Sequence, residues 1–307
     1  MNMVNYIIKR ILTGIFSLFV LITVTFFLTR SMPGSPFQSS NISPNMVETM
    51  EKEYGLDEPA AVQYKNYLTG LLRGEMGISY KKQGVRVSDV IARAWPYTVK
   101  VGGLAILTAL VLGTALGICQ ACSRKTLVRE GIFIGTVLGG AIPNFAAAVL
   151  LLLIFGVKLG WFPVSGLLSR AHYVLPVLSL ALYPTTVVAR MMNQSIREES
   201  AKEYVVMAKA RGISQKKILY CHILRHAWTS ILGYLGPAAA YLITGSFVTE
   251  TVFNIPGLGR EFVNAVSGRD YTMIMGLTIF MGMVVIIVNL AMDILRMILE
   301  PSVRRSK

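Results

Sequence analysis

Six long stretches without Asp, Glu, Lys or Arg divide this chain, and they constrain its fold more than any other feature. A segment needs about 20 mainly apolar residues to cross the roughly 30 Å hydrocarbon core of a membrane. Inside lipid the backbone must satisfy its own hydrogen bonds, which a helix does within one segment. We therefore predict an all-α, polytopic membrane protein with six transmembrane helices. The stretches are Ile11–Thr29, Val101–Ser123, Gly131–Val157, Ala171–Ala189, Ala227–Thr249 and Tyr271–Met292.

The composition agrees with a membrane protein. Only 15% of the 307 residues are charged, whereas a soluble domain carries about 25%. The net charge of +14 would also suit a nucleic-acid binder, but the basic residues lie between the apolar stretches, so no nucleic-acid partner is predicted. Lys9 and Arg10 precede the first stretch as in a signal peptide. That stretch is too long for one, and Ser31–Pro36 is a poor cleavage site, so we interpret it as an uncleaved span.

The Lys and Arg residues of the short loops predict the orientation, because cytoplasmic loops carry an excess of them. If the N-terminus is inside, the short outer loops hold only Lys158, Arg170, Arg260 and Arg269. The long loop from residue 30 to 100 is largely exempt from the rule. Both termini are therefore predicted to be cytoplasmic. The basic residues on the inner side are then Lys9, Arg10, Arg124, Lys125, Arg129, Arg190, Arg197, Lys202, Lys209, Arg211, Lys216, Lys217, Arg225, Arg296, Arg304, Arg305 and Lys307.

Two local patterns predict helix packing. Apolar residues between Val87 and Ala94 recur at helical spacing on one face, and we expect Pro96 to bound that segment. Glycines at four-residue spacing are expected to let neighbouring helices approach closely. These rows are Gly113 and Gly117, and Gly131, Gly135 and Gly139. Prolines in or near the spans fit either kinked helices around a path or ordinary bundle packing. They are Pro143, Pro176, Pro184 and Pro237.

The predicted spans carry almost no ionisable side chain. Glu250 and Asp293 lie just past span ends. A proton-coupled transporter usually needs an acid within the membrane, so any transport energy is expected to come from elsewhere. The chain has no phosphate-binding loop of the form G-x-x-x-x-G-K-[ST]. The glycine-containing segment Ile255–Gly259 (IPGLG) is interpreted as a turn.

The sequence gives little support for a metal or redox site. Cys119 and Cys122 form a C-x-x-C at the end of an apolar stretch, where packing in a helix is the simpler interpretation. His222 and His226 have ligand-like spacing beside Cys221. Basic residues crowd them, and no carboxylate is near to complete a metal site. No catalytic, cofactor-binding or metal site is predicted.

The densest basic cluster lies between two apolar stretches, from Lys202 to Trp228. Residues 203–211 favour a helix, and Gly212 stands where a left-handed C-cap residue would. Ser214 can cap a second helix running from Gln215 towards Ala227. The pattern predicts a helix, a sharp turn and a helix. The physical argument leaves two interpretations open: a connector resting on anionic headgroups, or a rigid element docking into a partner's groove.

This stretch resembles the cytoplasmic "EAA" loop of ABC importer permeases. That loop has a pair of small residues, then three residues, then Gly, as Ala208 and Gly212 are spaced here. The peptide-transporter branch reads Y-V-R-T-A-R-A-K-G, and residues 204–212 read YVVMAKARG. The chain departs from the consensus Glu-Ala at Val206 and Met207, and it has Leu224-Arg225 in place of the closing Leu-Pro.

Further short motifs resemble the same branch in order along the chain. The chain as a whole is similar to the oligopeptide/dipeptide (and nickel) ABC importer permease family, with the oligopeptide branch nearest. The motifs are MPGSP (Met32–Pro36), where Ser35 replaces the usual Asp, YGLDEP (Tyr54–Pro59), GEMGIS (Gly74–Ser79), IPGLGREF (Ile255–Phe262) and RDYTMIMG (Arg269–Gly276).

The resemblance implies one of two permease subunits in a bacterial cell membrane, forming half of the path for oligopeptides or dipeptides. The partners it implies are a second related permease, two separate ATP-binding cassette subunits, an extracytoplasmic binding protein, peptide substrate and membrane lipid, with no cofactor. It also implies a type I importer permease fold. Its parts would be a first transmembrane helix (1–30), an extracytoplasmic loop region (31–96) and a five-helix permease core (97–307), with a cytoplasmic coupling loop at about 190–228. The ATPase-coupling residues would be Glu203, Tyr204, Ala208, Lys209, Arg211 and Gly212. Nickel-chelate or other small-solute import, or a secondary transporter, are the alternatives, and no path-lining residue is predicted.

Overall fold

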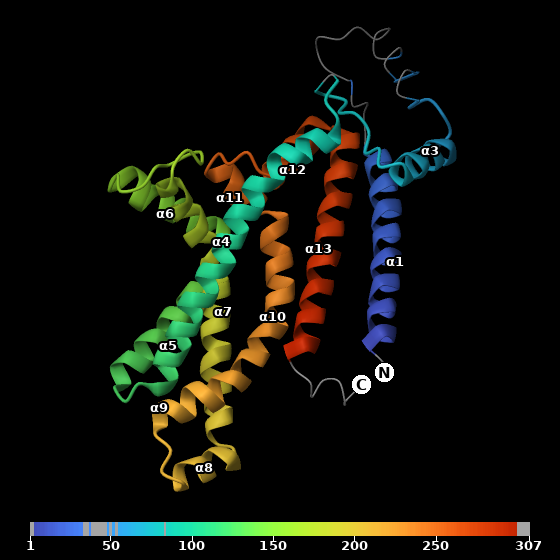
Figure 1. Cartoon of the computed structure of the whole chain (residues 1–307). Coiled ribbons are helices and arrows are strands. Elements are labelled where there is room, and N and C mark those ends of the chain that lie inside the picture. Colours follow the sequence, from blue (N-terminus) through green and yellow to red (C-terminus); the bar gives the residue numbers. More distant parts are fainter. Residues whose placement is uncertain are drawn as a thin grey trace.

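The computed structural model describes residues 3–32, 37, 48, 51–52, 55–82 and 84–299. Parts of the MPGSP and YGLDEP motifs and the basic tail after 299 lie outside these residues. Five helices run alongside one another and form the body of the molecule (Figure 1). They are α1 (Met3–Arg30), α4 (Val87–Cys122), α7 (Val174–Ser200), α10 (Leu224–Thr244) and α13 (Tyr271–Leu299). β pairing in the described part is one isolated bridge between Ile78 and Arg86.

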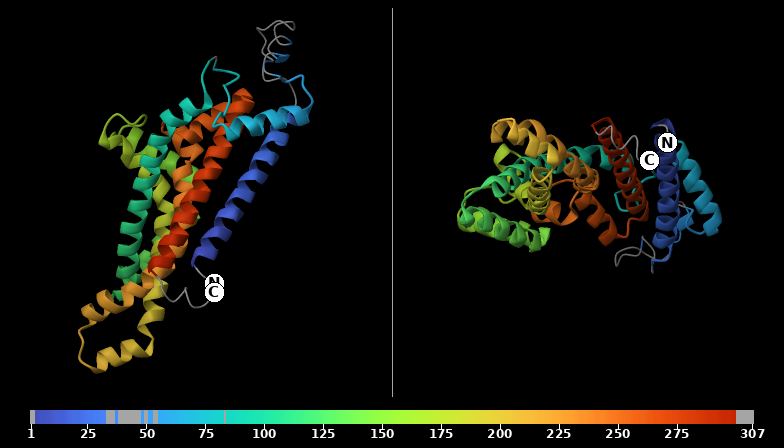
Figure 2. Two further views of the ribbon diagram at one scale, coloured as in Figure 1. Left: turned by 45° about the vertical axis from the view of Figure 1, so that its right-hand side comes forward. Right: turned by 90° about the horizontal axis from the view of Figure 1, so that it is seen from below.

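The short helices gather at the two ends of this bundle. At one end α8 (Glu203–Ala210) and α9 (Gln215–Ile218) project beyond the long helices, and α1 begins and α13 ends towards the same end (Figures 1 and 2). We call this the α8 end. The opposite end, the α12 end, carries α3 (Ala60–Leu72), α11 (Phe247–Val252) and α12 (Leu258–Gly268).

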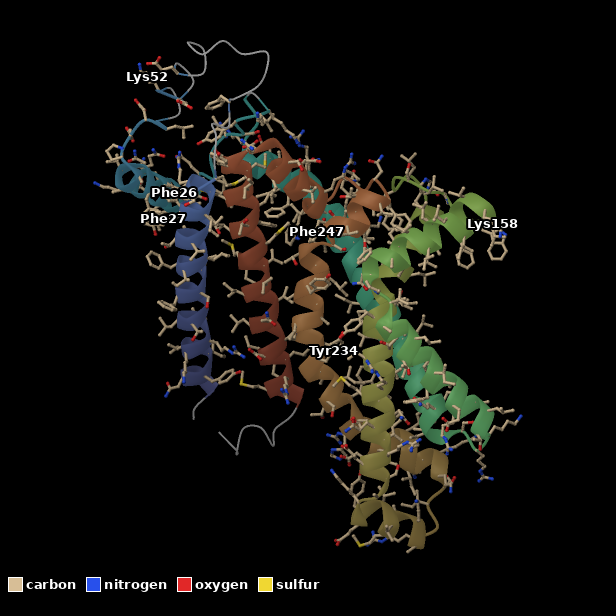
Figure 3. The ribbon with its side chains drawn as sticks, turned by 180° about the vertical axis from the view of Figure 1, so that it is seen from behind. Phe26, Phe27, Lys52, Lys158, Tyr234 and Phe247 are labelled. Carbon is tan, nitrogen blue, oxygen red and sulfur yellow. The ribbon has the colours of Figure 1, made fainter. Side chains whose placement is uncertain are left out.

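In the described part, five helices are long and apolar enough to cross a membrane, and a bent pair would make a sixth. The bent pair covers the stretch predicted as the third span. Helix α5 (Thr126–Ala141) is followed by α6 (Asn144–Leu151), which continues into a π-helical segment (Leu152–Lys158). The helix axis bends by 103° between α5 and α6. Figure 3 shows Lys158 at the outer end of the π-helical segment that follows α6.

The break has a local cause. Ile142 has an extended backbone (φ −78°, ψ 120°), and Pro143 follows it. Proline disfavours a helical conformation in the residue before it and cannot donate to the preceding turn. An unbroken helix over Gly131–Val157 is therefore excluded.

Pro96 does not end a helix, contrary to the expectation from sequence. It lies inside α4, which continues for 36 residues. Val87, Ile91 and Ala94 before it pack in one cluster with residues of α12 and α13, and Val101 after it packs in another. An interior proline costs roughly 3 kcal/mol in an isolated helix. Burial on both sides of Pro96 outweighs that cost.

Close helix packing explains the whole glycine row of α4 but only the last glycine of the row in α5. A β-carbon at Gly117 would lie 2.6 Å from Met192 Cβ of α7, and Gly113 is similarly crowded. A β-carbon at Gly131 or Gly135 would meet nothing within 4 Å. A β-carbon at Gly139 would lie 3.0 Å from Thr186 Cγ2 of α7. The expectation of close packing is therefore confirmed for the row in α4 and for Gly139, whereas no described helix of this chain approaches Gly131 or Gly135.

The two acids expected just past span ends occupy other environments. Helix α13 continues beyond Met292, so Asp293 lies within it and pairs with Arg10 of α1 at 2.8 Å. Helix α10 ends at Thr244, and Glu250 lies in the separate helix α11, where its side chain is 3% exposed. Sequence spacing could not show the pairing of Asp293 with Arg10, because the two residues lie near opposite ends of the chain.

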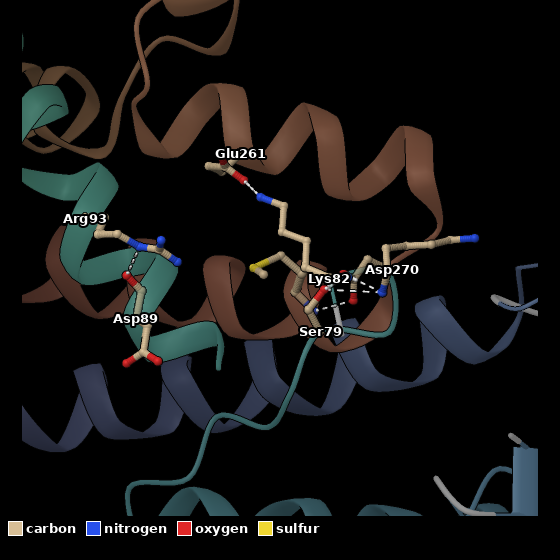
Figure 4. Close-up of polar contacts among 8 residues, drawn as sticks. Ser79, Lys82, Asp89, Arg93, Glu261 and Asp270 are labelled. Carbon is tan, nitrogen blue, oxygen red and sulfur yellow. Dashed lines mark hydrogen bonds and ion pairs between the residues drawn. The ribbon is translucent and has the colours of Figure 1, made fainter. Parts of the chain in front are cut away.

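At the α12 end, Asp270 ties the loop before α4 to the start of α13 (Figure 4). Its buried carboxylate accepts hydrogen bonds from Ser79 Oγ, from Tyr80 N at 3.1 Å and from Met273 N at 3.2 Å. Lys82 of the same loop pairs with Glu261 of α12 at 2.6 Å. Two independent polar contacts therefore fix this loop on the bundle.

Candidate functional site

Helix α8 is anchored to the bundle by one face. Val205 and Ala208 are both buried, and their three-residue spacing puts them on one side of the helix. They pack in one cluster with Met192 of α7, Ile218 of α9 and Leu224 of α10. A displacement of α8 would therefore be felt by α7 and α10.

Gly212 ends α8 in the way the sequence predicted. Its φ is 75°, a left-handed conformation that side chains rarely adopt. Gly212 N donates to Lys209 O at 3.0 Å, and Ile213 N donates to Ala208 O at 3.2 Å. These two bonds form a Schellman motif, which satisfies carbonyls at the helix end. The turn is thus fixed by backbone geometry.

The second helix differs in detail from the expectation. Ser214 holds the N-cap position of α9, but its side chain makes no capping hydrogen bond. A π-helical segment, Leu219–Ile223, then joins α9 directly to α10. The helix expected to run from Gln215 towards Ala227 is therefore continuous with a long helix of the bundle.

Tyr204 ties the start of α8 to the end of α7. Its hydroxyl donates to Glu199 Oε2 at 2.8 Å, and Lys202 Nζ donates to Oε1 of the same carboxylate at 2.6 Å. Burial, together with the bond to Glu199, raises the pKa of Tyr204 to about 12. The tyrosine ring also lies 6.0 Å from the ring of His226 in α10. Tyr204 is therefore a neutral donor at physiological pH, linking three helices.

The opposite face of α8 is open. Val206 and Met207 are 58% and 56% exposed. Glu203, Lys209 and Arg211 are exposed beside them. This open face combines an apolar centre with charges of both signs, and it protrudes from the bundle (Figure 1).

Of the six residues singled out from sequence, Tyr204 and Ala208 hold α8 in place, Gly212 ends it, and the other three lie on its open face. Reasoning from sequence missed Glu199 and Val205. Val205 could have been found from its three-residue spacing to Ala208, whereas nothing local marks Glu199 as the partner of Tyr204. In the described residues no group of three or more His, Cys, Asp or Glu side chains could hold a metal ion.

The fold is similar to that of a solved ABC transporter chain. A solved structure titled "Inward facing conformations of the MetNI methionine ABC transporter" matches with a TM-score of 0.57 and 16% identity, over 69% of this chain and 96% of that chain.

The chain belongs to the family described as the inner membrane component of binding-protein-dependent transport systems, whose model matches residues 110–305. The model of that family's N-terminal part matches residues 3–102. The family consists of transport components of the membrane, not of enzymes.

Two relatives cover nearly the whole chain. The oligopeptide transport system permease protein OppB of Haemophilus influenzae is 39% identical over 98% of this chain and 100% of its own length. The dipeptide transport system permease protein DppB of Lactococcus lactis is 35% identical over the same shares of the two chains.

Proposed function

We propose that this chain is a permease subunit of an ATP-driven importer of peptides and that α8 is its ATPase-coupling helix. The observation that carries the proposal is the two-sided character of α8. Its inner face is fixed to α7 and α10, and its outer face, with Val206 and Met207, is exposed. Helix α8 projects beyond the bundle (Figure 1). A short anchored helix in this position is better placed to bind in a groove of a partner protein than to lie on lipid headgroups.

Because α8 is packed against α7 and α10, a movement of α8 would be transmitted to both helices. Closure of two ATP-binding cassette subunits would press on the open face of α8, and the buried contacts of Val205 and Ala208 would pass that motion to α7 and α10. A partner can shift a conformational equilibrium only through contacts that differ between the two states. Glu203, Lys209 and Arg211 would supply those contacts around the apolar centre.

The remaining parts of the complex follow from this assignment. A second related permease would complete the path, and an extracytoplasmic binding protein would deliver peptide at the α12 end. The α8 end, with the start of α1 and the end of α13, would be cytoplasmic. Residues 31–96 would then form the extracytoplasmic region, and residues 97–307 would form the permease core.

The decisive experiment is uptake by the assembled complex in proteoliposomes. The chain with a second permease, two ATPase subunits and binding protein should accumulate peptide only with ATP, and the chain alone should not. Replacing Met207 with Asp should lower uptake about tenfold, because an unpaired carboxylate would be buried in the ATPase groove. Leu127→Asp is the matched control, since Leu127 is an exposed apolar residue at the start of α5. Uphill uptake by the chain alone would refute the proposal.

A further inference from the structure

A cavity of about 340 Å³ lies between α7 and α10, at the break of the bent pair. The residues that matter in its wall are Asn144, Tyr183, Tyr234, Pro237, Ala238 and Tyr241. We propose that this cavity is a segment of the translocation path and that its tyrosine hydroxyls bind the main chain of an extended peptide. The inference rests on the proposed function and adds the site and the chemistry of contact.

The α10 wall is one continuous stripe. Tyr234, Pro237, Ala238 and Tyr241 follow the spacing i, i+3, i+4, i+7, which puts them on one face of the helix. With a rise of 1.5 Å per residue, the two tyrosines lie about 10 Å apart along the axis. An extended chain advances roughly 3.3–3.6 Å per residue. The stripe is therefore long enough to contact about three residues of a peptide.

Tyr234 lies too deep for an interfacial belt. Tyr234 is ten residues from each end of α10, or about 15 Å from either end along the axis. Figure 3 shows it about midway along the helix. Tyrosines that anchor a helix in the membrane interface lie at headgroup level instead. A mid-helix phenol needs another explanation.

The three tyrosine hydroxyls have no hydrogen-bond partner among the residues that the structure describes. Tyr183 and Tyr241 are 45% and 56% exposed. Within the described residues none of the hydroxyls of Tyr183, Tyr234 and Tyr241 makes a hydrogen bond. Polar groups facing the hydrocarbon core are unfavourable, and those at membrane depth line a water-filled cavity or face protein. The three hydroxyls therefore point to a cavity filled with water or with a polar ligand.

The lining selects the ligand class. Among the described residues, no charged side chain contributes to the wall. A phenol hydroxyl and the Asn144 amide both donate and accept hydrogen bonds, so they can pair with peptide N–H and C=O groups alike. The tyrosine rings offer apolar faces to side chains. Such a wall fits the main chain of peptides whatever charge their side chains carry, and it does not fit an ion path.

Cysteine accessibility in the assembled complex tests the location. Cys119, Cys122 and Cys221 are first replaced by Ser, and Tyr183→Cys or Tyr241→Cys is added. We expect both thiols to react with a charged, membrane-impermeant methanethiosulfonate reagent, and trialanine with ATP to slow the reaction at least threefold. Phe16→Cys is the control, because Phe16 is exposed on the peripheral helix α1, and it should stay unreactive. Thiols at 183 and 241 that behave like the control, or that react at a rate unaffected by trialanine, would overturn the inference.

Conservative substitution tests the chemistry. The triple variant Tyr183→Phe, Tyr234→Phe, Tyr241→Phe keeps the rings and removes the hydroxyls. We expect uptake of trialanine, trilysine and triglutamate to fall by the same factor, about tenfold. Unchanged uptake, or a loss confined to one peptide, would contradict main-chain recognition. Absence of ATP-driven uptake by the wild-type complex would instead refute the proposed function, so the two failures are distinguishable.

Discussion

Thr98 donates a hydrogen bond of 2.8 Å to the carboxylate of Glu250, joining residues 152 positions apart. The same hydroxyl accepts a bond of 2.9 Å from Leu258 N, and Arg260 N donates to the other carboxylate oxygen at 3.0 Å. Helices α4, α11 and α12 therefore meet in one buried polar network at the α12 end. Buried networks of this kind are stabilising only while every member is paired.

Replacing Thr98 with Val should destabilise the protein. Valine has the same shape but leaves Leu258 N–H and one Glu250 oxygen buried without this partner, at a cost of roughly 1–3 kcal/mol for each group. A lower thermal midpoint in detergent is the expected result. Thr251→Val is the control, because the Thr251 hydroxyl is exposed and bonds only to Phe247 O of its own helix. Equal midpoints for the two variants would mean that the network contributes nothing.

Replacing Gly212 with Val should uncouple the subunit. A left-handed conformation costs an ordinary side chain roughly 1–2 kcal/mol, and a β-branched one is worse. We expect peptide-stimulated ATPase activity of the complex to fall about fivefold while the amount of protein in the membrane is unchanged. Gly212→Asn should retain most activity, because Asn tolerates this conformation. An added β-carbon at Gly212 would meet nothing within 4 Å. Any loss of activity in the Gly212→Val variant would therefore come from backbone strain and not from a steric clash. Normal stimulation in the Gly212→Val variant would refute the role of the turn.

Features decided by neighbouring residues could be predicted from the sequence, and features decided by distant residues could not. The end of α8 was predictable because the left-handed turn is decided by Gly212 and its immediate neighbours. The prolines were not predictable individually: Pro143 coincides with a break, whereas Pro184 and Pro237 lie inside continuous helices. The outcome depends on how each flank is buried. Thr98 is 152 residues from Glu250, and Ser79 is 191 residues from Asp270, so no local pattern identifies these two side-chain partners.

Replacing Asp270 with Asn should loosen the loop before α4. The buried carboxylate accepts bonds from Ser79 Oγ, Tyr80 N and Met273 N (Figure 4), and an amide has only one acceptor oxygen for them. Hydrogen exchange at residues 77–82 should become faster. Asp89→Asn is a matched control, because Asp89 is exposed on α4 and its backbone oxygen, not its carboxylate, accepts from Arg93. Exchange rates in the Asp270→Asn variant that match those of the control would show that Asp270 does not hold the loop.

Replacing Tyr204 with Phe should lower the thermal midpoint by about 2 °C. This corresponds to roughly 1 kcal/mol for the lost hydrogen bond to Glu199, a charged group that is partly screened by solvent.

The pH dependence of this difference in thermal midpoint gives a sharper test. The pKa of Tyr204 is raised to about 12, against about 10 in an unfolded chain. A group whose folded pKa is raised contributes stability that is fully present below the unfolded pKa and is lost as pH rises through the folded one. The difference in midpoint between wild type and Tyr204→Phe should therefore stay constant from pH 7 to about 10. A difference that shrinks between pH 8 and 9.5 would mean that Tyr204 ionises early and that its bond to Glu199 does not hold α8 against α7.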